Sequence, residues 1–182
     1  MPPQGYVLSM FEFGDKRIPT VKFDASKITP AIEIELKAAI RETNEIPEAE
    51  HIRIFDAVLA GVKRGGDLYV IAKALETMPG NLSKAKVGEI CRNLNNRAMA
   101  KVTTQRQTDL GITHAKWLYS GAPCVANFPP SESDLARDAA HKAANGQEYE
   151  VSKGIFMNGL WRRPREEPGC KCVANSVILG FD

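Results

Sequence analysis

Hydrophobic and polar residues alternate along the first part of the chain. The alternation covers residues 5–23 and is interrupted at Gly14-Asp15-Lys16, where a glycine and two charged residues indicate a turn. A period of two is typical of strands, so we expect a β-hairpin or an extended arm within residues 1–28. A lone two-stranded ribbon is marginal in water, and we therefore expect it to pack on the rest of the chain or on a neighbouring subunit.

The period changes to that of helices at Thr29-Pro30, a pair that suits a helix start. Four segments follow in which apolar residues recur every three or four positions, and glycine or proline separates the later ones. We predict a small helical bundle over residues 29–110. The expected inward positions are Ile32, Leu36 and Ile40; Ile52, Phe55, Leu59 and Val62; Leu68, Ile71 and Leu75; and, after the N-cap Ser83, Val87, Ile90, Leu94 and Ala98.

The helical period ends near Leu110-Gly111, where we place a domain boundary. Beyond it, Asn158-Gly159 is the strongest short hairpin signal of the chain, because both residues adopt the positive φ of a tight hairpin turn. The predicted elements are a strand over 112–120, a helix over 134–144, a hairpin of 149–157 and 160–163, and a strand over 173–181. We therefore expect an α+β module over residues 111–182, and an α+β fold for the whole chain.

Composition narrows the classes of function. A chain of 182 residues with 43% hydrophobic and 25% charged residues is ordinary for a soluble globular protein. The net charge of +2 creates no overall field that favours nucleic acid. No apolar run approaches the roughly 20 residues of a membrane helix, and the first residues lack the pattern of a signal peptide. We expect a soluble protein in a reducing cytoplasm, where its four cysteines favour free thiols or metal ligation.

Cys124, His141, Cys170 and Cys172 form a candidate metal site with the spacing C-x16-H-x28-C-x-C. Thiolate and imidazole ligands suit tetrahedral zinc, and four protein ligands leave no open position for catalysis, so the zinc would be structural. One residue between the last two cysteines is fewer than zinc sites usually have. The alternative is a pair of small buried thiols in the last strand, with His141 hydrogen-bonded within its helix. Cys91, on the longest helical segment, is expected in the core.

A cysteine nucleophile is the enzymatic alternative, with Cys124 activated by His141 or His114. Four cysteines and three histidines make such a pairing weak evidence. The sequence has no glycine-rich phosphate loop, H-E-x-x-H motif or nucleophile elbow. We therefore do not expect an enzyme. The acidic pairs are expected to be solvated: Glu33 with Glu35, and Glu166 with Glu167.

The longest predicted helix is locally basic. Residues 84–106 contain six basic side chains and a single acidic one, Glu89. Such a surface can contact the phosphates of nucleic acid or an acidic partner protein, and the alternative is a solvated helix face. A second basic cluster follows the predicted hairpin. The residues expected to bind DNA or a partner are Arg92, Arg97, Lys101, Arg106, Arg162 and Arg163.

One ordered set of motifs runs through residues 85–175. In chain order it comprises Asn95-Asn96-Arg97, Thr103-Thr104, Gly111-Ile112, Lys116-Trp117, Ser120-Gly121, His141, Asn145-Gly146, Tyr149, Val151-Ser152-Lys153-Gly154, Phe156, Asn158-Gly159, Trp161, Pro164 and Cys170-Lys171-Cys172. In order and spacing this set resembles the phage head morphogenesis family, typified by the F protein of phage Mu and also called minor head proteins.

The chain departs from that family in four respects. Arg137 lies four residues before His141, where the family usually has three. Residues 123–134 look like an insertion, which makes Cys124 the least secure of the proposed ligands. The ending Cys-Lys-Cys replaces Cys-Arg-Cys. The helical region is shorter than in many relatives and follows an unusual hairpin, so the resemblance says little about residues 1–80.

The resemblance implies a virion component that works by binding, present in few copies and active in head assembly or DNA delivery. The implied partners are the portal protein, the major capsid protein and double-stranded DNA, without a membrane. The implied location is the capsid interior or the vicinity of the portal, and the host cytoplasm during assembly. Two alternatives are an enzyme delivered with the genome, nuclease or toxin-like, that uses Cys124 and His141, and a stand-alone protein that interferes with assembly.

Overall fold

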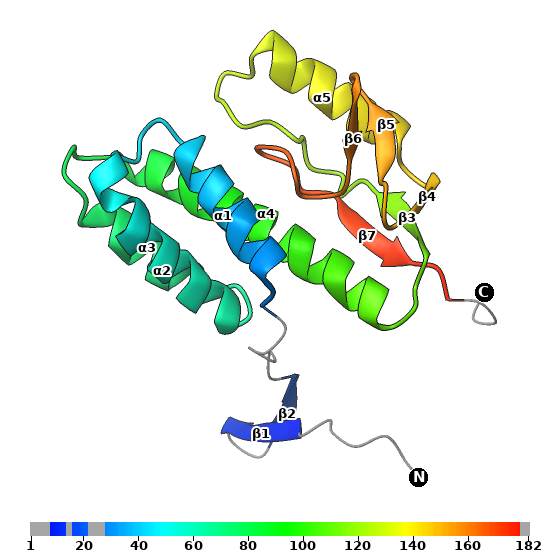
Figure 1. The fold of residues 1–182 in the computed structure, drawn as a ribbon, viewed down its shortest axis with the longest axis horizontal. Helices are drawn as coiled ribbons and strands as arrows, with labels where there is room; N and C mark the ends of the chain where they lie inside the picture. Colours follow the sequence, from blue (N-terminus) through cyan, green and yellow to red (C-terminus); the bar gives the residue numbers. More distant parts are fainter. Residues whose placement is uncertain (1–7, 14–15, 22–27, 179–182) are drawn as a thin grey trace.

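The fold is an α+β fold, as predicted (Figure 1). The structure is a computed structural model, and it describes residues 8–13, 16–21 and 28–178. These residues form α-helices and short antiparallel sheets. No helix among them is long and apolar enough to cross a bilayer.

The predicted N-terminal hairpin is present. Strands β1 (Leu8–Phe13) and β2 (Lys16–Val21) pair antiparallel, with Phe13 opposite Lys16. Gly14 and Asp15, which the sequence places in the turn, lie outside the described residues.

The helical bundle over residues 29–110 is also confirmed. It consists of α1 (Pro30–Arg41), the short 3-10 helix η2 (Glu48–Glu50), α2 (His51–Lys63), α3 (Leu68–Glu76) and α4 (Lys84–Asp109). Ser83 caps α4 as predicted, because its hydroxyl accepts a hydrogen bond from the backbone N–H of Lys86 at 3.2 Å.

On α2, the predicted inward positions are correct at Val62, which is buried, and at Phe55 and Leu59, which pack half-buried against the core, and wrong at Ile52. Ile52 is 77% exposed, whereas Ile54 and Val58 are fully buried. Ile52 and Ile54 both fit a helical period, so the sequence pattern alone does not distinguish them. Packing against α3 selects the face that contains Gly61, because a Cβ at Gly61 would lie 2.7 Å from the carbonyl oxygen of Asp67. Only a glycine lets the two helices approach so closely.

The C-terminal residues form the predicted mixture of one helix and several strands. The elements are β3 (His114–Leu118), α5 (Glu132–Ala143), β4 (Glu148–Glu150), β5 (Ile155–Met157), β6 (Leu160–Arg162) and β7 (Val173–Ser176). Strand β3 lies between β4 and β7 in an antiparallel sheet, and β5 and β6 form the expected hairpin. Its turn residues Asn158 and Gly159 have φ of 51° and 80°.

The predicted strands are shorter than expected; β3, for example, covers His114–Leu118 of the predicted 112–120. The strand over 149–157 is divided, because the chain leaves the sheet at Val151 and turns at Gly154, where φ is 90°. This turn separates β4, which pairs with β3, from β5, which pairs with β6. The last strand ends at Ser176, and residues 179–182 lie outside the described part of the chain.

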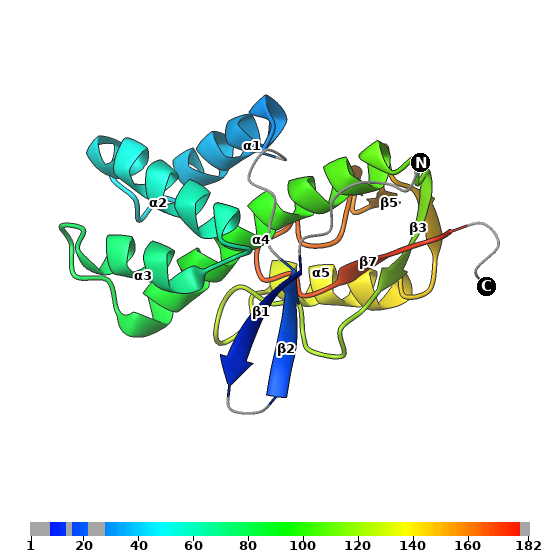
Figure 2. The same cartoon turned by 90° about the horizontal axis from the view of Figure 1, so that it is seen from below.

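Two separate hydrophobic cores lie on either side of the expected boundary at Leu110-Gly111. Helix α4 belongs to the bundle and also runs along the C-terminal module (Figures 1 and 2). From α4, the Asn96 amide donates to the carbonyl of Cys170 at 3.2 Å, and the Gln107 amide donates to the Ser176 hydroxyl at 3.0 Å. The bundle and the module therefore share α4 as their connection.

Candidate metal centre

Trp117 forms the middle of the second core. It lies on the central strand β3 and is fully buried. Its ring centroid is 5.0 Å from that of His141 and 6.5 Å from that of Tyr149. The indole thus fixes the imidazole of His141 on the neighbouring helix α5.

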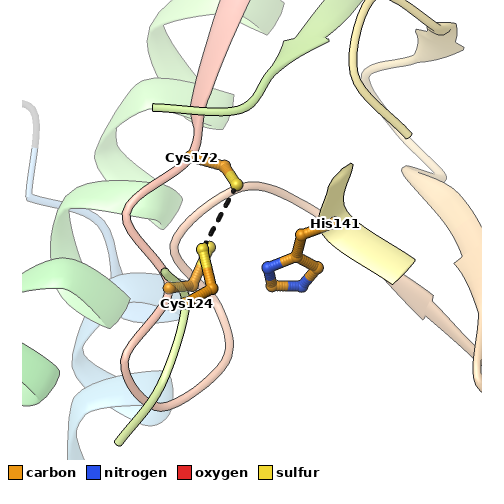
Figure 3. Close-up of side chains that lie close together, drawn as sticks. Cys124, His141 and Cys172 are labelled. Carbon is orange, nitrogen blue, oxygen red and sulfur yellow. Dashed lines mark hydrogen bonds between the residues drawn. The ribbon is translucent and has the colours of Figure 1, made fainter. Parts of the chain in front are cut away.

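The four residues predicted as metal ligands meet in this core. Cys124, His141, Cys170 and Cys172 are all buried, and their ligand atoms lie within 4.8 Å of one another. They come from the loop after β3, from α5 and from the segment just before β7. Figure 3 shows the imidazole turned toward the sulfur atoms. Residues distant in sequence thus form one compact group that could hold a metal ion.

The sulfur spacing suits a metal ion better than a disulfide. Cys124 Sγ and Cys172 Sγ are 3.6 Å apart, and all four cysteines are free thiols. Two sulfurs bound to one zinc at about 2.3 Å in tetrahedral geometry lie about 3.8 Å apart. A disulfide would bring them to about 2.05 Å. The observed distance is close to the edge of a zinc tetrahedron, and it also fits two thiols in contact.

His141 presents one ring nitrogen to a carboxylate and leaves the other without a partner. Its Nε2 lies 2.8 Å from Glu167 Oε2, whereas its buried Nδ1 has no hydrogen-bond partner. A buried polar atom without a partner is costly, and native structures contain few. Histidines that bind metals usually donate the second ring N–H to a carboxylate. Nδ1 is therefore the atom that a metal ion would satisfy.

The electrostatics of the group favour negative charge on the sulfur of Cys124, whereas contacts with Cys124 and Cys172, together with burial, raise the pKa of Cys170. Hydrogen bonds from Cys170 and Cys172, then contacts with His141 and the backbone N–H of Lys171, hold the pKa of Cys124 far below its ordinary value. Burial disfavours the charged form of His141, but its contacts with Cys124, Cys172 and Glu167 outweigh burial and raise its pKa to about 11. A thiolate is the form that a divalent cation requires of cysteine.

Backbone N–H groups also point at the sulfurs. Lys171 N donates to Cys124 Sγ at 3.4 Å, and Arg165 N donates to Cys170 Sγ at 3.2 Å. The segment that carries these donors folds tightly against the Cys124 loop at Gly169, where φ is 72°. A Cβ at Gly169 would overlap the carbonyl of Val125, so this approach requires glycine.

Cys124 belongs to the group although it lies in the segment that looked like an insertion. Helix α5 holds both of its backbone groups: Asp138 Oδ1 accepts from Cys124 N at 2.8 Å, and Arg137 Nε donates to the Cys124 carbonyl at 3.2 Å. Cys170 and Cys172 lie in the segment before β7, not within a strand. That irregular backbone lets both sulfurs reach one point despite the single intervening residue.

Asp134 organises the rest of this loop. Its carboxylate accepts hydrogen bonds from the backbone N–H groups of Ala126 at 3.0 Å and Ser131 at 3.1 Å, and it pairs with Arg137. Burial alone would raise the pKa of Asp134, but these hydrogen bonds outweigh burial and hold the pKa below its usual range. The ionised carboxylate is therefore the form that the fold stabilises.

We predict that Asp134→Asn destabilises the protein by about 1–3 kcal/mol at neutral pH, the size expected for hydrogen bonds to a charged group. The folded pKa is depressed, so the stabilisation is complete well above the unfolded value of about 3.9 and is lost as pH falls below it. Urea unfolding of both proteins at neutral and acidic pH measures the difference. An equal difference at pH values on both sides of 3.9 would contradict this account.

The cysteine proposed as a nucleophile is not exposed to solvent. Cys124 and His141 are both fully buried, which keeps a substrate from the proposed nucleophile and base. His114, the other proposed base, contacts the hydroxyl of its neighbour Thr113 at 3.0 Å. Cys91 lies in the bundle core as expected, and burial raises its pKa to about 11. A buried protonated thiol of this kind is inert.

Several basic residues predicted to bind DNA or a partner form ion pairs within the chain. Arg97 lies 2.8 Å from Glu35 and 2.5 Å from Glu42, and Lys101 lies 3.2 Å from Glu166. The remaining pairs are Arg163 with Glu166 at 3.2 Å and Arg162 with Glu167 at 3.5 Å. These four positive charges are largely neutralised where they stand. Arg92 and Arg106 are exposed, and their contact with DNA or a partner stays a prediction.

The expectation that the acidic pairs are solvated was wrong for three residues. The side chain of Glu35 is 22% exposed, that of Glu166 12% and that of Glu167 16%. Each pairs with a basic residue or with His141. Glu35 also lies 3.6 Å from Lys101, more than sixty positions away in the sequence, so no local pattern shows their pairing. The position of Glu167, three residues before the proposed ligand Cys170, was the one sequence feature that could have indicated its contact with the site.

Comparisons with protein-family models, with curated proteins and with solved structures found no match. Function must therefore be inferred from the residues of this chain.

Proposed function

We propose that Cys124, His141, Cys170 and Cys172 bind one structural zinc ion. The unpartnered, buried Nδ1 of His141 beside three sulfurs is the observation that carries the proposal. Three cysteines and one histidine are a common ligand set of structural zinc sites, and soft thiolates favour zinc over magnesium or calcium. Four protein ligands fill a tetrahedral ion, so the site would stabilise the module and perform no catalysis.

A bound ion would join parts of the module that the small sheet alone holds weakly. Its ligands lie on the loop after β3, on α5 and before β7, and strands β4 and β5 have only three residues each. Small modules with thin cores are commonly stabilised by a structural metal. The zinc would fix the short segments around the buried ring of Trp117.

Glu167→Gln tests the carboxylate that contacts His141. We expect zinc affinity to fall about 10- to 100-fold, because such carboxylates orient the ligand and raise its basicity. Competition with a chromogenic chelator measures the affinity. Glu166→Gln is the matched control, since Glu166 pairs with Lys101 and Arg163 and should leave zinc affinity unchanged. Equal losses in the two variants would contradict a specific role for Glu167.

For the whole chain, we propose a minor head protein of a bacteriophage that acts by binding. The support is the resemblance over residues 85–175, together with the position of its most distinctive members. Trp117, His141, Tyr149, Cys170 and Cys172 all contribute to one core around one site. The burial of Cys124 and His141 favours binding over catalysis.

The partner test is co-purification with a portal ring. We expect the chain to remain bound to the portal protein, or to the major capsid protein, at a fixed and low ratio through gel filtration. Failure to bind either would contradict the proposal. Absence of the chain from purified particles, combined with reduced yield of another phage, would instead support the assembly-interference alternative.

DNA would be a further partner of the same protein, contacted by Arg92 and Arg106. Binding through phosphates should weaken with salt by a slope of about −0.9 per phosphate on a double-logarithmic plot. Arg92→Glu combined with Arg106→Glu should remove the binding. Binding that is unchanged between low and physiological salt would contradict DNA as a partner.

A further inference from the structure

A groove of about 570 Å³ runs between α1 and α2 in the helical bundle. Its apolar lining consists of Ile40, Ile52 and Phe55. Ile40 and the half-buried Phe55 belong to the core of the bundle, whereas Ile52 is 77% exposed. Exposing one isoleucine is ordinary, but here it stands beside a groove with an apolar floor.

The two walls of this groove carry opposite charges. Lys37 and Arg41 line it from α1, and Glu48 and Asp56 line it from the side of η2 and α2. Within the described residues, none of these four side chains takes part in an ion pair. The ammonium of Lys37 lies 5.0 Å from the ring centroid of Phe55, at the edge of the apolar floor.

The charged side chains of the groove differ from the basic side chains of α4 in their pairing. Arg97 and Lys101 are paired with carboxylates of this chain, as described above. The groove charges face outward in two rows of opposite sign, with apolar side chains between them. Such an arrangement is what a charged and partly apolar partner surface requires.

We propose that the groove is the interface of a homodimer, in which a second copy of this chain packs its α1–α2 face against the first. A two-fold rotation places the basic wall of one copy against the acidic wall of the other, and the reverse. Both rows of charge are then matched at once, and the two Ile52 side chains are buried near the axis. A uniformly acidic or basic partner would be repelled by one of the two walls.

Ile52→Asp tests the apolar part of the interface. The wild-type chain should be a dimer in light scattering coupled to gel filtration, and the variant should dissociate at least about tenfold more readily, because it loses a buried isoleucine. The fold should tolerate the change, since Ile52 is exposed in the single chain. Leu135→Asp is the matched control on α5, 57% exposed and outside the groove, and should leave the dimer unchanged.

Charge reversal tests the two-fold arrangement itself. Lys37→Glu with Arg41→Glu makes both walls acidic, and Glu48→Lys with Asp56→Lys makes both walls basic. Each double variant alone should be monomeric, because like charges then face each other across the axis. An equimolar mixture should form a heterodimer whose stability falls with added salt.

A monomeric wild-type chain would overturn the proposal. So would a dimer that Ile52→Asp leaves intact, or a mixture of the two charge-reversed variants that does not associate. Circular dichroism of each variant checks that α1–α4 are retained. Zinc content and portal binding are measured separately, so failure of the dimer leaves the proposed function open to its own tests.

Discussion

Replacing Cys170 and Cys172 together with alanine is expected to abolish zinc binding and to unfold the C-terminal module. The wild-type protein should contain about one equivalent of zinc, held by four ligands. Structural zinc contributes about 10 kcal/mol or more of binding free energy in zinc-finger peptides, and this free energy stabilises the fold that forms the site. Elemental analysis and thermal unfolding measure the two effects. A strong chelator should reproduce them in the wild-type protein.

The loss should be confined to the module. The bundle has its own core of buried aliphatic residues from α1 to α4, none of which contacts the proposed ion. We therefore expect most helical circular dichroism to remain, while the fluorescence of the buried Trp117 shifts toward that of a solvated indole. Retention of Trp117 fluorescence after loss of the metal would show that the sheet is stable without it.

Cys91→Ala is the control for this experiment. Cys91 is as buried as the proposed ligands, but it lies in the bundle core. The Cys91→Ala variant should keep the full zinc content and lose only about 1 kcal/mol of stability, a common cost of a single substitution. A metal-free wild-type protein whose stability is insensitive to chelator would end the zinc proposal, and equal metal loss in Cys91→Ala would contradict the proposed ligand set.

Trp117→Ala is expected to destabilise the module by about 3–5 kcal/mol, the usual cost of removing a fully buried aromatic side chain. Trp117 has no exposed surface, and its ring contacts both His141 and Tyr149. Its removal would leave a large cavity beside the imidazole and free that ring to rotate. Zinc affinity should therefore fall together with stability.

The second tryptophan provides a matched comparison. Trp161 is 56% exposed on β6 and packs against Phe156 on β5, with ring centroids 5.5 Å apart. Trp161→Ala should change stability by no more than about 0.5–1.5 kcal/mol, the range of one aromatic pair, and leave zinc affinity unchanged. Urea unfolding measures the loss of stability in each of the two variants. Similar losses in both would show that the core around Trp117 can collapse onto the cavity.

Local patterns predicted most elements of the fold. Ser83 caps α4 and Asn158-Gly159 turns the β5–β6 hairpin, because capping and turn formation depend on a residue and its immediate neighbours. The exposure of Ile52 on α2 could not be predicted in the same way. Ile52 and Ile54 fit a helical period equally well, and the choice depends on how closely α3 approaches Gly61.

The candidate site, too, could be predicted only in part from the sequence. The residue types alone indicated that Cys124, His141, Cys170 and Cys172 could bind zinc, because few other roles use these donors together. Their convergence could not be deduced from the chain, since it depends on α5 holding the loop of Cys124 through Asp138 and on the sheet placing β7 beside β3. The tertiary structure alone identified Glu167 as the partner of His141.

The sequence by itself determined the α+β class, the helical bundle and the hairpin, and it named the candidate ligands, because these depend on short-range periodicity or on side-chain chemistry. Only the tertiary structure decided which of the predicted binding charges form ion pairs within the chain. Arg97 and Lys101 looked like a binding surface along one helix, yet they pair with Glu35 and Glu166 from distant segments. Ion pairs between distant segments depend on how the segments pack in three dimensions, so the local sequence does not predict them.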